Sequence, residues 1–224
     1  LKKPSQAADL YNQTADYFLA QGSPDRAAES LEKAARAVET TDLPRAFSLY
    51  SESCATYESE DRMRFGVETF KRAIALMIKN GRWEDAEAVS VRLGEAFVKL
   101  DQRPNFNKQA LSTVVICLAA GNVGAANTRL DAFGAVGGFL QSEEGSIAIN
   151  ILEAFENGDE ELLASTLKRQ HLNFLDNEVT RTARTLKAPP RAQPPPARTD
   201  GGVGQPASEA LKELQDELEE DGYC

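Results

Sequence analysis

The 224-residue sequence contains a single histidine, His171, and only three cysteines, Cys54, Cys117 and Cys224, which lie far apart. No two cysteines have metal-ligand spacing, and one imidazole excludes a histidine-rich metal site. Ser–His or Cys–His catalysis would have to use His171, which follows a basic run at a predicted helix end and is expected to be an ordinary surface or capping residue. We therefore predict that the protein is not an enzyme and binds no metal or cofactor.

Long apolar runs and net positive charge are also lacking. No run approaches the roughly 18 apolar residues of a membrane span. A net charge of −10 argues against nucleic acid as the main partner, although it allows a local basic patch. Cys54 and Cys117 fall on apolar helical faces and are predicted to be buried thiols, as expected in a reducing compartment.

What the sequence does contain is a repeat. Pro4, Pro24 and Pro44 are each twenty residues apart, and each is followed by apolar residues at helical spacing. Proline is tolerated in the first turn of a helix, so this pattern predicts successive helices of about fifteen residues. Two classes of helix alternate, with matched positions Ala7/Ala46/Ala86, Leu10/Leu49/Val89 and Phe18/Tyr57/Phe97 in one class, and Leu31/Phe70/Leu111, Ala34/Ala73/Val114 and Val38/Met77/Leu118 in the other.

These matches recur every 39 to 41 residues. The predicted fold class is therefore all-α, a right-handed superhelix of antiparallel helix pairs similar to tetratricopeptide (TPR) arrays. The period of about 40 is longer than the roughly 34 residues of a standard TPR unit.

The chain is expected to divide into four parts. Residues 1–132 carry the helical repeats, and residues 133–186, which begin with a glycine-rich break, form a C-terminal helical cap. Residues 187–208 hold six of the ten prolines and form a linker, and residues 209–224 form an acidic tail. Linker and tail are too poor in apolar residues to fold alone and are predicted to be disordered.

Three stretches carry a resemblance to a known family: Gly22–Ala28 (GSPDRAA), Pro44–Tyr50 (PRAFSLY) and Asn80–Ala86 (NGRWEDA). With the cap sequence Ile151–Glu156 (ILEAFE) and the acidic ending, the chain resembles the gamma type of soluble NSF attachment protein (SNAP) over residues 1–186. Because Leu1 is not an initiator methionine and a helix begins at once, we expect the family's N-terminal helices, including a membrane-contacting loop, to be missing.

The resemblance implies a non-enzymatic adaptor in vesicle-mediated transport. Such proteins bind the SNARE four-helix bundle and recruit and stimulate the hexameric ATPase NSF, which takes the bundle apart; they act in the cytoplasm, peripherally on endomembranes. Basic inner-face positions of the alpha relative, which grip the acidic SNARE bundle, match Lys71 and Lys108 here, and Arg72 adds a neighbouring charge. A further basic position is occupied by Val67.

The resemblance also implies a surface for the basic N-terminal domains of NSF. Glu153 and Glu156 match two acidic positions of that surface, whereas two others fall on Asn157 and near Ala119. The penultimate residue, usually leucine in the family and needed to stimulate the ATPase, is Tyr223 here.

An alternative from a different class is a TPR-like scaffold or co-chaperone that binds peptide segments. That function would need lysine and asparagine to recur along the inner face of consecutive repeats. The matching positions here are mostly alanine, serine and apolar residues.

Overall fold

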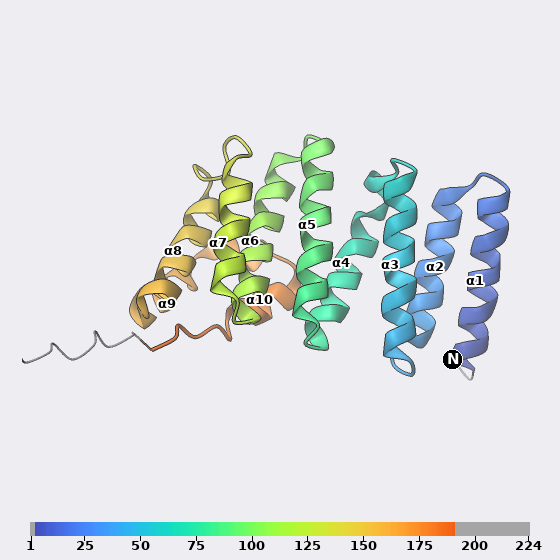
Figure 1. Ribbon diagram of the computed structural model, residues 1–224, viewed down its shortest axis with the longest axis horizontal. Helices are drawn as coiled ribbons and strands as arrows, with labels where there is room; N and C mark the ends of the chain where they lie inside the picture. The colour runs from blue at the N-terminus through green and yellow to red at the C-terminus, as the bar shows by residue number, and fades with distance from the viewer. Residues whose placement is uncertain (1–2, 191–224) are drawn as a thin grey trace, which may run out of the picture. The chain divides into compact units, whose positions relative to one another are not determined.

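The computed structural model describes residues 3–190, and all regular secondary structure in this range is helical (Figure 1). The helices are α1 Pro4–Ala20, α2 Pro24–Val38, α3 Leu43–Ser59, α4 Met63–Lys79, α5 Trp83–Lys99, α6 Arg103–Ala119, α7 Val123–Gly134, α8 Glu143–Asn157, α9 Glu160–Thr166, the 3₁₀ helix η1 Gln170–Phe174 and α10 Asn177–Ala183. The predicted all-α fold class is confirmed. Most of the predicted linker and all of the predicted tail lie outside the described residues.

Consecutive helices pack as antiparallel neighbours, and each class of helix repeats at the predicted period. The odd-numbered helices α1, α3, α5 and α7 begin 39, 40 and 40 residues apart, and the even-numbered helices α2, α4, α6 and α8 do the same. In Figure 1, α3, α5 and α7 form a front layer, with α4, α6 and α8 behind them. We call the surface of that second layer the even-helix face. The right-handed twist and the boundary at residues 132–133 remain predictions.

The turns explain why the helices end where they do. Pro4, Pro24 and Pro44 each lie in the first turn of a helix, as predicted. After α4, Gly81 adopts a left-handed φ of 67°, which glycine reaches without steric cost. Asp61 takes the corresponding place after α3 with φ 52°. Aspartate is among the few other residues that tolerate this conformation, so the turn geometry is conserved along the array.

Small residues set the distance between helices. In α2, Ala27, Ala28, Ala34 and Ala35 are all fully buried, which lets the neighbouring helices approach closely. The hydroxyl of Ser53 donates to the carbonyl of Ala28 at 2.7 Å inside this contact. Farther along, α6 is buried on nearly every side, because α5, α7, α8 and α10 all pack against it.

Arginine–carboxylate pairs join α3, α5, α7 and α4 to the helix of the same class one period earlier. The pairs are Arg45–Asp9, Arg92–Glu58 and Arg129–Glu87 between odd-numbered helices and Arg72–Glu32 between even-numbered helices. In the pair between α3 and α5, Arg92 Nε donates to Glu58 Oε1 at 2.8 Å while a second nitrogen donates to the other oxygen. Partly exposed ion pairs contribute about 0.2–1 kcal/mol each to the free energy of unfolding. Their main effect is therefore to fix how neighbouring helix pairs align with each other.

The connection between α7 and α8 is ordered by an aromatic cluster. The rings of Phe106, Phe133 and Phe139 meet edge to face, with centroids 5.8–6.3 Å apart. This contact brings the backbone of Phe139 against the first turn of α8, at Gly145. The glycine-rich break that the sequence indicates is therefore a packed turn.

After α9 the chain returns to the middle of the array. Residues 168–188, which we call the strap, comprise η1, α10 and the chain that follows. Helix α10 contacts α4 and α6, so the strap lies on the even-helix face, seen as the orange segment behind α5 and α6 in Figure 1. Val179, Thr182 and Ala183 are its buried side.

The thiols of Cys54 and Cys117 are buried and unpaired, as predicted. Burial raises the pKa of each to about 12, and burial likewise raises the pKa of Tyr57 to about 12. Burial and a hydrogen bond to Glu39 raise the pKa of Tyr50 as well. These groups keep their protons in the folded state at pH values where the unfolded chain loses them.

We therefore expect the free energy of unfolding to fall as the pH rises from about 8 to about 12, since the unfolded state then binds fewer protons than the folded state. Urea titrations across this range would measure the fall. The double variant Cys54→Ala, Cys117→Ala should show a smaller decrease between about pH 8 and pH 9.5, where the thiols but not the phenols titrate in the unfolded chain. Stability that is constant up to pH 11 would contradict this expectation.

Candidate functional site

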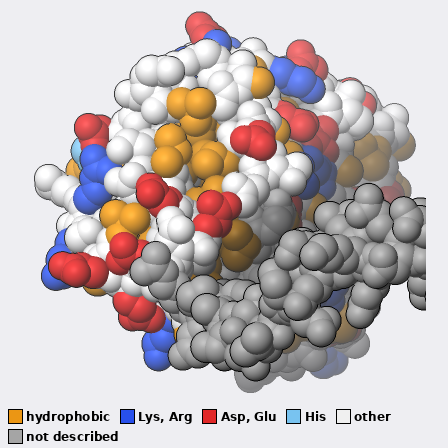
Figure 2. Space-filling view, turned by 60° about the vertical axis from the view of Figure 1, so that its left-hand side comes forward, with side chains coloured by type: hydrophobic (Ala, Val, Ile, Leu, Met, Phe, Trp, Pro, Cys, Tyr) orange, Lys and Arg blue, Asp and Glu red, His pale blue; other side chains and the backbone are white. Residues whose placement is uncertain are grey.

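An acidic surface lies on the exposed side of α8. Ile149, Glu153 and Glu156 are spaced by four and three residues, so they share one face of the helix, and all three side chains are exposed. Glu156 accepts a hydrogen bond from Asn127 Nδ2 of α7 at 2.6 Å, whereas Glu153 faces solvent. Figure 2, turned toward the α8–α9 end, shows acidic side chains around a hydrophobic area. This combination suits a basic partner with an apolar contact at its centre.

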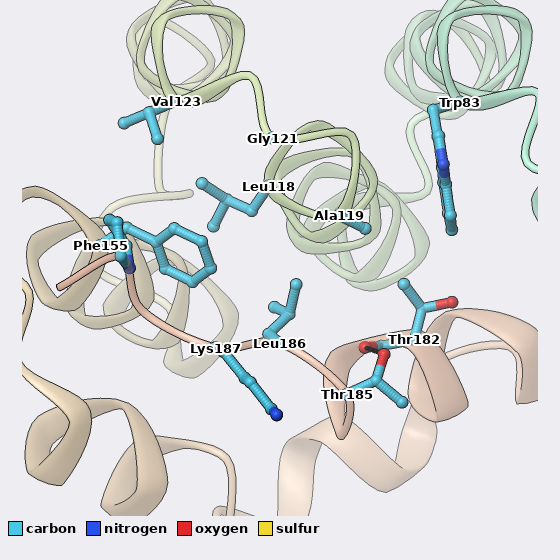
Figure 3. A pocket seen from close by; sticks show the side chains of 11 residues that line it. Trp83, Leu118, Ala119, Gly121, Val123, Phe155, Thr182, Thr185, Leu186 and Lys187 are labelled. Carbon is cyan, nitrogen blue, oxygen red and sulfur yellow. Dashed lines mark hydrogen bonds between the residues drawn. The ribbon is translucent and has the colours of Figure 1, made fainter.

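The strap is anchored at the edge of the array where α5 begins and α6 ends. There Leu186 points into the same hollow as Leu118 and Phe155, and Trp83 closes one side (Figure 3). Ala188, two residues farther on, is buried. These apolar contacts hold the end of the strap against the array.

The lysines predicted to bind SNAREs lie under the strap. Lys71 Nζ is 3.4 Å from Asp176 Oδ1, and Lys79 Nζ, about two turns later on the same side of α4, is 3.5 Å from Glu178 Oε1. Lys108 Nζ lies 5.9 Å from the centroid of the Phe174 ring, within the range of a cation–π contact. Lys71 and Lys108 thus line one small hollow together, and the strap supplies partners for both.

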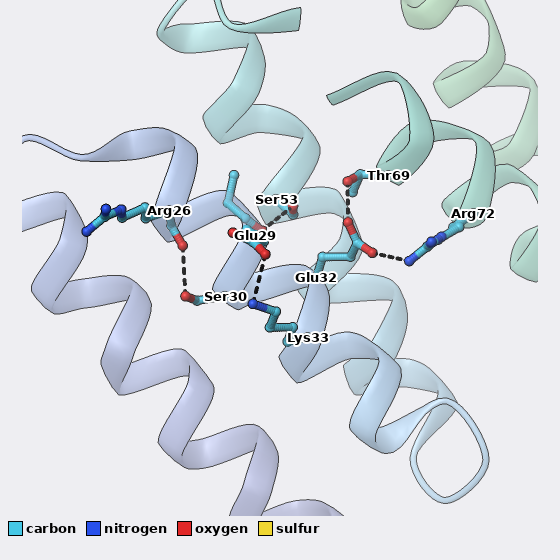
Figure 4. Close-up of polar contacts among 9 residues, drawn as sticks. Arg26, Glu29, Ser30, Glu32, Lys33, Ser53, Thr69 and Arg72 are labelled. Carbon is cyan, nitrogen blue, oxygen red and sulfur yellow. Dashed lines mark hydrogen bonds and ion pairs between the residues drawn. The ribbon is translucent and has the colours of Figure 1, made fainter. Parts of the chain in front are cut away.

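Arg72 is engaged on the other side of α4. It pairs with Glu32 of α2, and the second carboxylate oxygen of Glu32 accepts from the Thr69 hydroxyl at 2.6 Å (Figure 4). The Glu32 side chain is only 14% exposed, so Arg72 compensates a carboxylate that is largely removed from water. Its first role is to join two helix pairs, although 46% of its own side chain remains accessible.

Among residues 3–190, no group of three histidine, cysteine, aspartate or glutamate residues is placed to hold a metal ion. No helix of this part of the chain has the length and apolar character needed to cross a membrane. His171 lies half-buried in η1, with its ring edge-on to Phe174 at 6.0 Å.

Comparison with known proteins shows which family the chain belongs to. The sequence profile of the family described as "Soluble NSF attachment protein, SNAP" matches residues 1–171. The chain belongs to this family. Two gamma-soluble NSF attachment proteins are similar to it: that of Dictyostelium discoideum is 30% identical over 186 residues, and that of Arabidopsis thaliana is 26% identical over 182 residues. These matches cover 83% and 81% of the present chain.

The resemblance to the gamma type of SNAP is thereby confirmed. The aligned regions cover 57% of the Dictyostelium protein and 62% of the Arabidopsis protein, so the chain spans about three fifths of the length of these SNAP relatives. The activity and partners of the complete relatives are therefore proposed, and not established, for this chain.

The residues that the sequence singled out fall into four places, one of them that of Arg72, which pairs with Glu32 of α2. Lys71 and Lys108 come together on the even-helix face, Glu153 and Glu156 share one side of α8, and Tyr223 lies outside the described residues. The contacts that sequence reasoning missed are the strap residues Phe174, Asp176 and Glu178. Leucine spacing indicated helices in this segment, but no local pattern indicated that they return to α4 and α6.

Proposed function

We propose that this chain is a non-enzymatic adaptor in vesicle-mediated transport, which binds assembled SNARE complexes and recruits and stimulates the ATPase NSF. The observation that carries the proposal is the match of the SNAP family across residues 1–171. It is supported by two surfaces of different chemistry, one on the even-helix face and one on the exposed side of α8.

The even-helix face is the proposed SNARE-binding side. Lys71, Arg72 and Lys108 are its proposed basic residues, and each keeps part of its side chain accessible or lies at the margin of the strap. A SNARE bundle is a wide rod of helices, so it can lie across helices and strap together. Contacts of this kind act through screened surface charge and weaken as ionic strength rises.

The acidic side of α8 is the proposed NSF-binding surface, with Glu153 and Glu156 facing basic N-terminal domains of the ATPase. Complementary charges at such a rim raise the association rate and make binding sensitive to salt. Ile149, which lies one turn before Glu153 on the same side of α8 and is 38% exposed, offers an apolar contact beside them. Tyr223 is the proposed residue for stimulating the ATPase after binding.

The alternative of a peptide-holding scaffold receives less support. A peptide clamp needs an open groove along the inner helices, and α10 already lies against α4 and α6 there. The acidic ending with Tyr223 also has no part in that mechanism.

The deciding experiment is a pull-down of NSF by the full chain with and without assembled SNARE bundle. Exchanging Glu153 and Glu156 for lysine should weaken NSF recruitment about tenfold at low ionic strength, because two attractions become repulsions. Binding of the bare SNARE bundle should not change.

The matched control for this exchange reverses Glu52 and Glu95, which are exposed on α3 and α5. This variant has the same net charge and should recruit NSF as the wild type does. Equal losses in both variants would assign the effect to overall charge and would contradict the proposed surface.

A further inference from the structure

The two sides of the strap carry opposite charge. Residues 168–187 contain five lysine and arginine residues but only two acidic residues, Asp176 and Glu178, in a chain whose net charge is −10. Both acidic side chains point toward α4, where they pair with Lys71 and Lys79. Glu178 is only 13% exposed. Both acidic residues of the strap are therefore paired with lysines of the array beneath it.

The outward side of α10 is basic. The Arg181 side chain is 74% exposed, and its ion pair within residues 3–190 is with Glu178, at 3.3 Å on the same helix. Arg184, one turn later on the same side, is exposed and donates from Nη2 to Asn173 Oδ1 at 2.7 Å. An amide oxygen does not neutralise the guanidinium, so its charge remains available to a partner.

The strap also carries an exposed aromatic ring. Phe174 follows Asn173 directly and is 55% exposed, although Lys108 and His171 both contact its ring. Arginine and aromatic side chains are the residue types that most often carry binding energy at protein interfaces. Phe174, Arg181 and Arg184 are thus three exposed side chains of the strap, and the hydrogen bond from Arg184 to Asn173 ties the end of α10 to the residue that precedes Phe174.

We propose that Phe174, Arg181 and Arg184 are the main contact of the even-helix face with an acidic helical partner, the SNARE bundle. This inference rests on the proposed function and deepens it by assigning the contact to the strap. Lys71, besides being a proposed contact residue itself, then also acts indirectly, as does Lys79, because their pairs with Asp176 and Glu178 hold α10 in place. These pairs neutralise Lys71 and Lys79, while Arg181 and Arg184 place positive charge on the outer side of α10.

The test measures binding of the full chain to assembled SNARE bundle at low and at physiological ionic strength. Exchanging Arg181 and Arg184 for glutamate should weaken binding about tenfold at low ionic strength and less at physiological ionic strength. The milder exchange Arg181→Gln, Arg184→Gln should give a smaller loss in the same direction. Phe174→Ala should weaken binding at both ionic strengths, since its contribution is not electrostatic. Because all three side chains are exposed, these variants should melt within a few degrees of the wild type.

The matched control exchanges Lys99 and Arg62 for glutamate, which gives the same net charge away from the strap. Wild-type binding by this control, together with the loss in the arginine variants, would support the proposal. Full binding by the Arg181→Glu, Arg184→Glu variant would overturn it, and so would an equal loss in the control. If the wild-type chain binds no SNARE bundle, that result contradicts the proposed function, and the assignment of the contact to the strap is overturned with it.

Discussion

Replacing Gly145 by alanine should lower the free energy of unfolding by about 3 kcal/mol, which for a chain of this size is on the order of 10 °C in Tm. A Cβ at this position would lie 2.1 Å from the carbonyl oxygen of Phe139 and 2.9 Å from its carbonyl carbon. Both are backbone atoms, so no side chain can rotate away. The overlap has to be relieved by moving the chain.

The carbonyl of Phe139 is not free to move. It accepts hydrogen bonds from the backbone N–H of Ser142 at 2.9 Å and from the Ser142 hydroxyl at 2.6 Å. The same hydroxyl oxygen accepts from the Gly145 N–H at 3.0 Å and caps α8. Relieving the clash therefore disturbs the cap of α8 as well as the position of the buried Phe139 ring. Thermal unfolding followed by circular dichroism would measure the loss.

Gly124 provides the control within the same chain. It is exposed in the first turn of α7, and a Cβ there would meet only Asn122 Oδ1, at 3.7 Å. Gly124→Ala should raise stability by about 0.5 kcal/mol, because alanine favours the helix more than glycine does. Similar melting temperatures for the two alanine variants would show that the close approach at Gly145 is not present in solution.

Replacing Tyr223 by alanine should reduce SNARE-stimulated ATP turnover of NSF and bundle disassembly about tenfold, while NSF and SNARE association stay nearly unchanged. The residue stands next to last, after Glu219, Glu220, Asp221 and Gly222. We expect the acidic residues to steer this ending toward a basic surface of NSF and the Tyr223 ring to provide an apolar contact there. Steady-state ATPase assays and binding assays on the same preparations would separate the two effects.

Two further variants test what the partner recognises at this end. Tyr223→Leu should retain stimulation if the requirement is for a bulky apolar side chain, and Cys224→Ser should behave as the wild type. A Tyr223→Ala variant that supports disassembly at the wild-type rate would show that the ending has no part in stimulation.

The helical repeat could be predicted because its signals are local and recur. Proline at helix starts, small residues at matched positions and a fixed period determine where each helix begins and which side it buries. The Arg72–Glu32 pair was harder to predict, because its residues are 40 positions apart, one more than the 39 that separate equivalent positions of α2 and α4. At the repeat spacing itself, Glu32 corresponds to Lys71, so the period alone does not indicate which basic residue is its partner.

The strap could not be placed from the sequence for the opposite reason. Its leucines and Val179 indicate a helix with one apolar side, but many surfaces of an array can accept such a side. The choice of α4 and α6 depends on the packed turn at Phe139, on the directions of α8 and α9, and on the lysines that meet Asp176 and Glu178. These are contacts between distant segments, and nothing in the local spacing specifies them. The structure brings Lys71 and Lys108 together under the strap, which the sequence did not indicate, and their role in binding SNAREs stays a prediction.

The return of the strap to α4 also changes how the array should come apart. A stack of helix pairs that touch mainly their neighbours opens stepwise from its ends, each pair almost independently. The pair Lys71–Asp176 instead joins positions 105 residues apart, so the two ends of the segment from α4 to α10 are in contact with each other. Its members should open in one cooperative event and show the slowest amide hydrogen exchange, while α1 to α3 fluctuate open in smaller steps. A partner seated on the strap would thus be held by the part of the protein that opens most rarely.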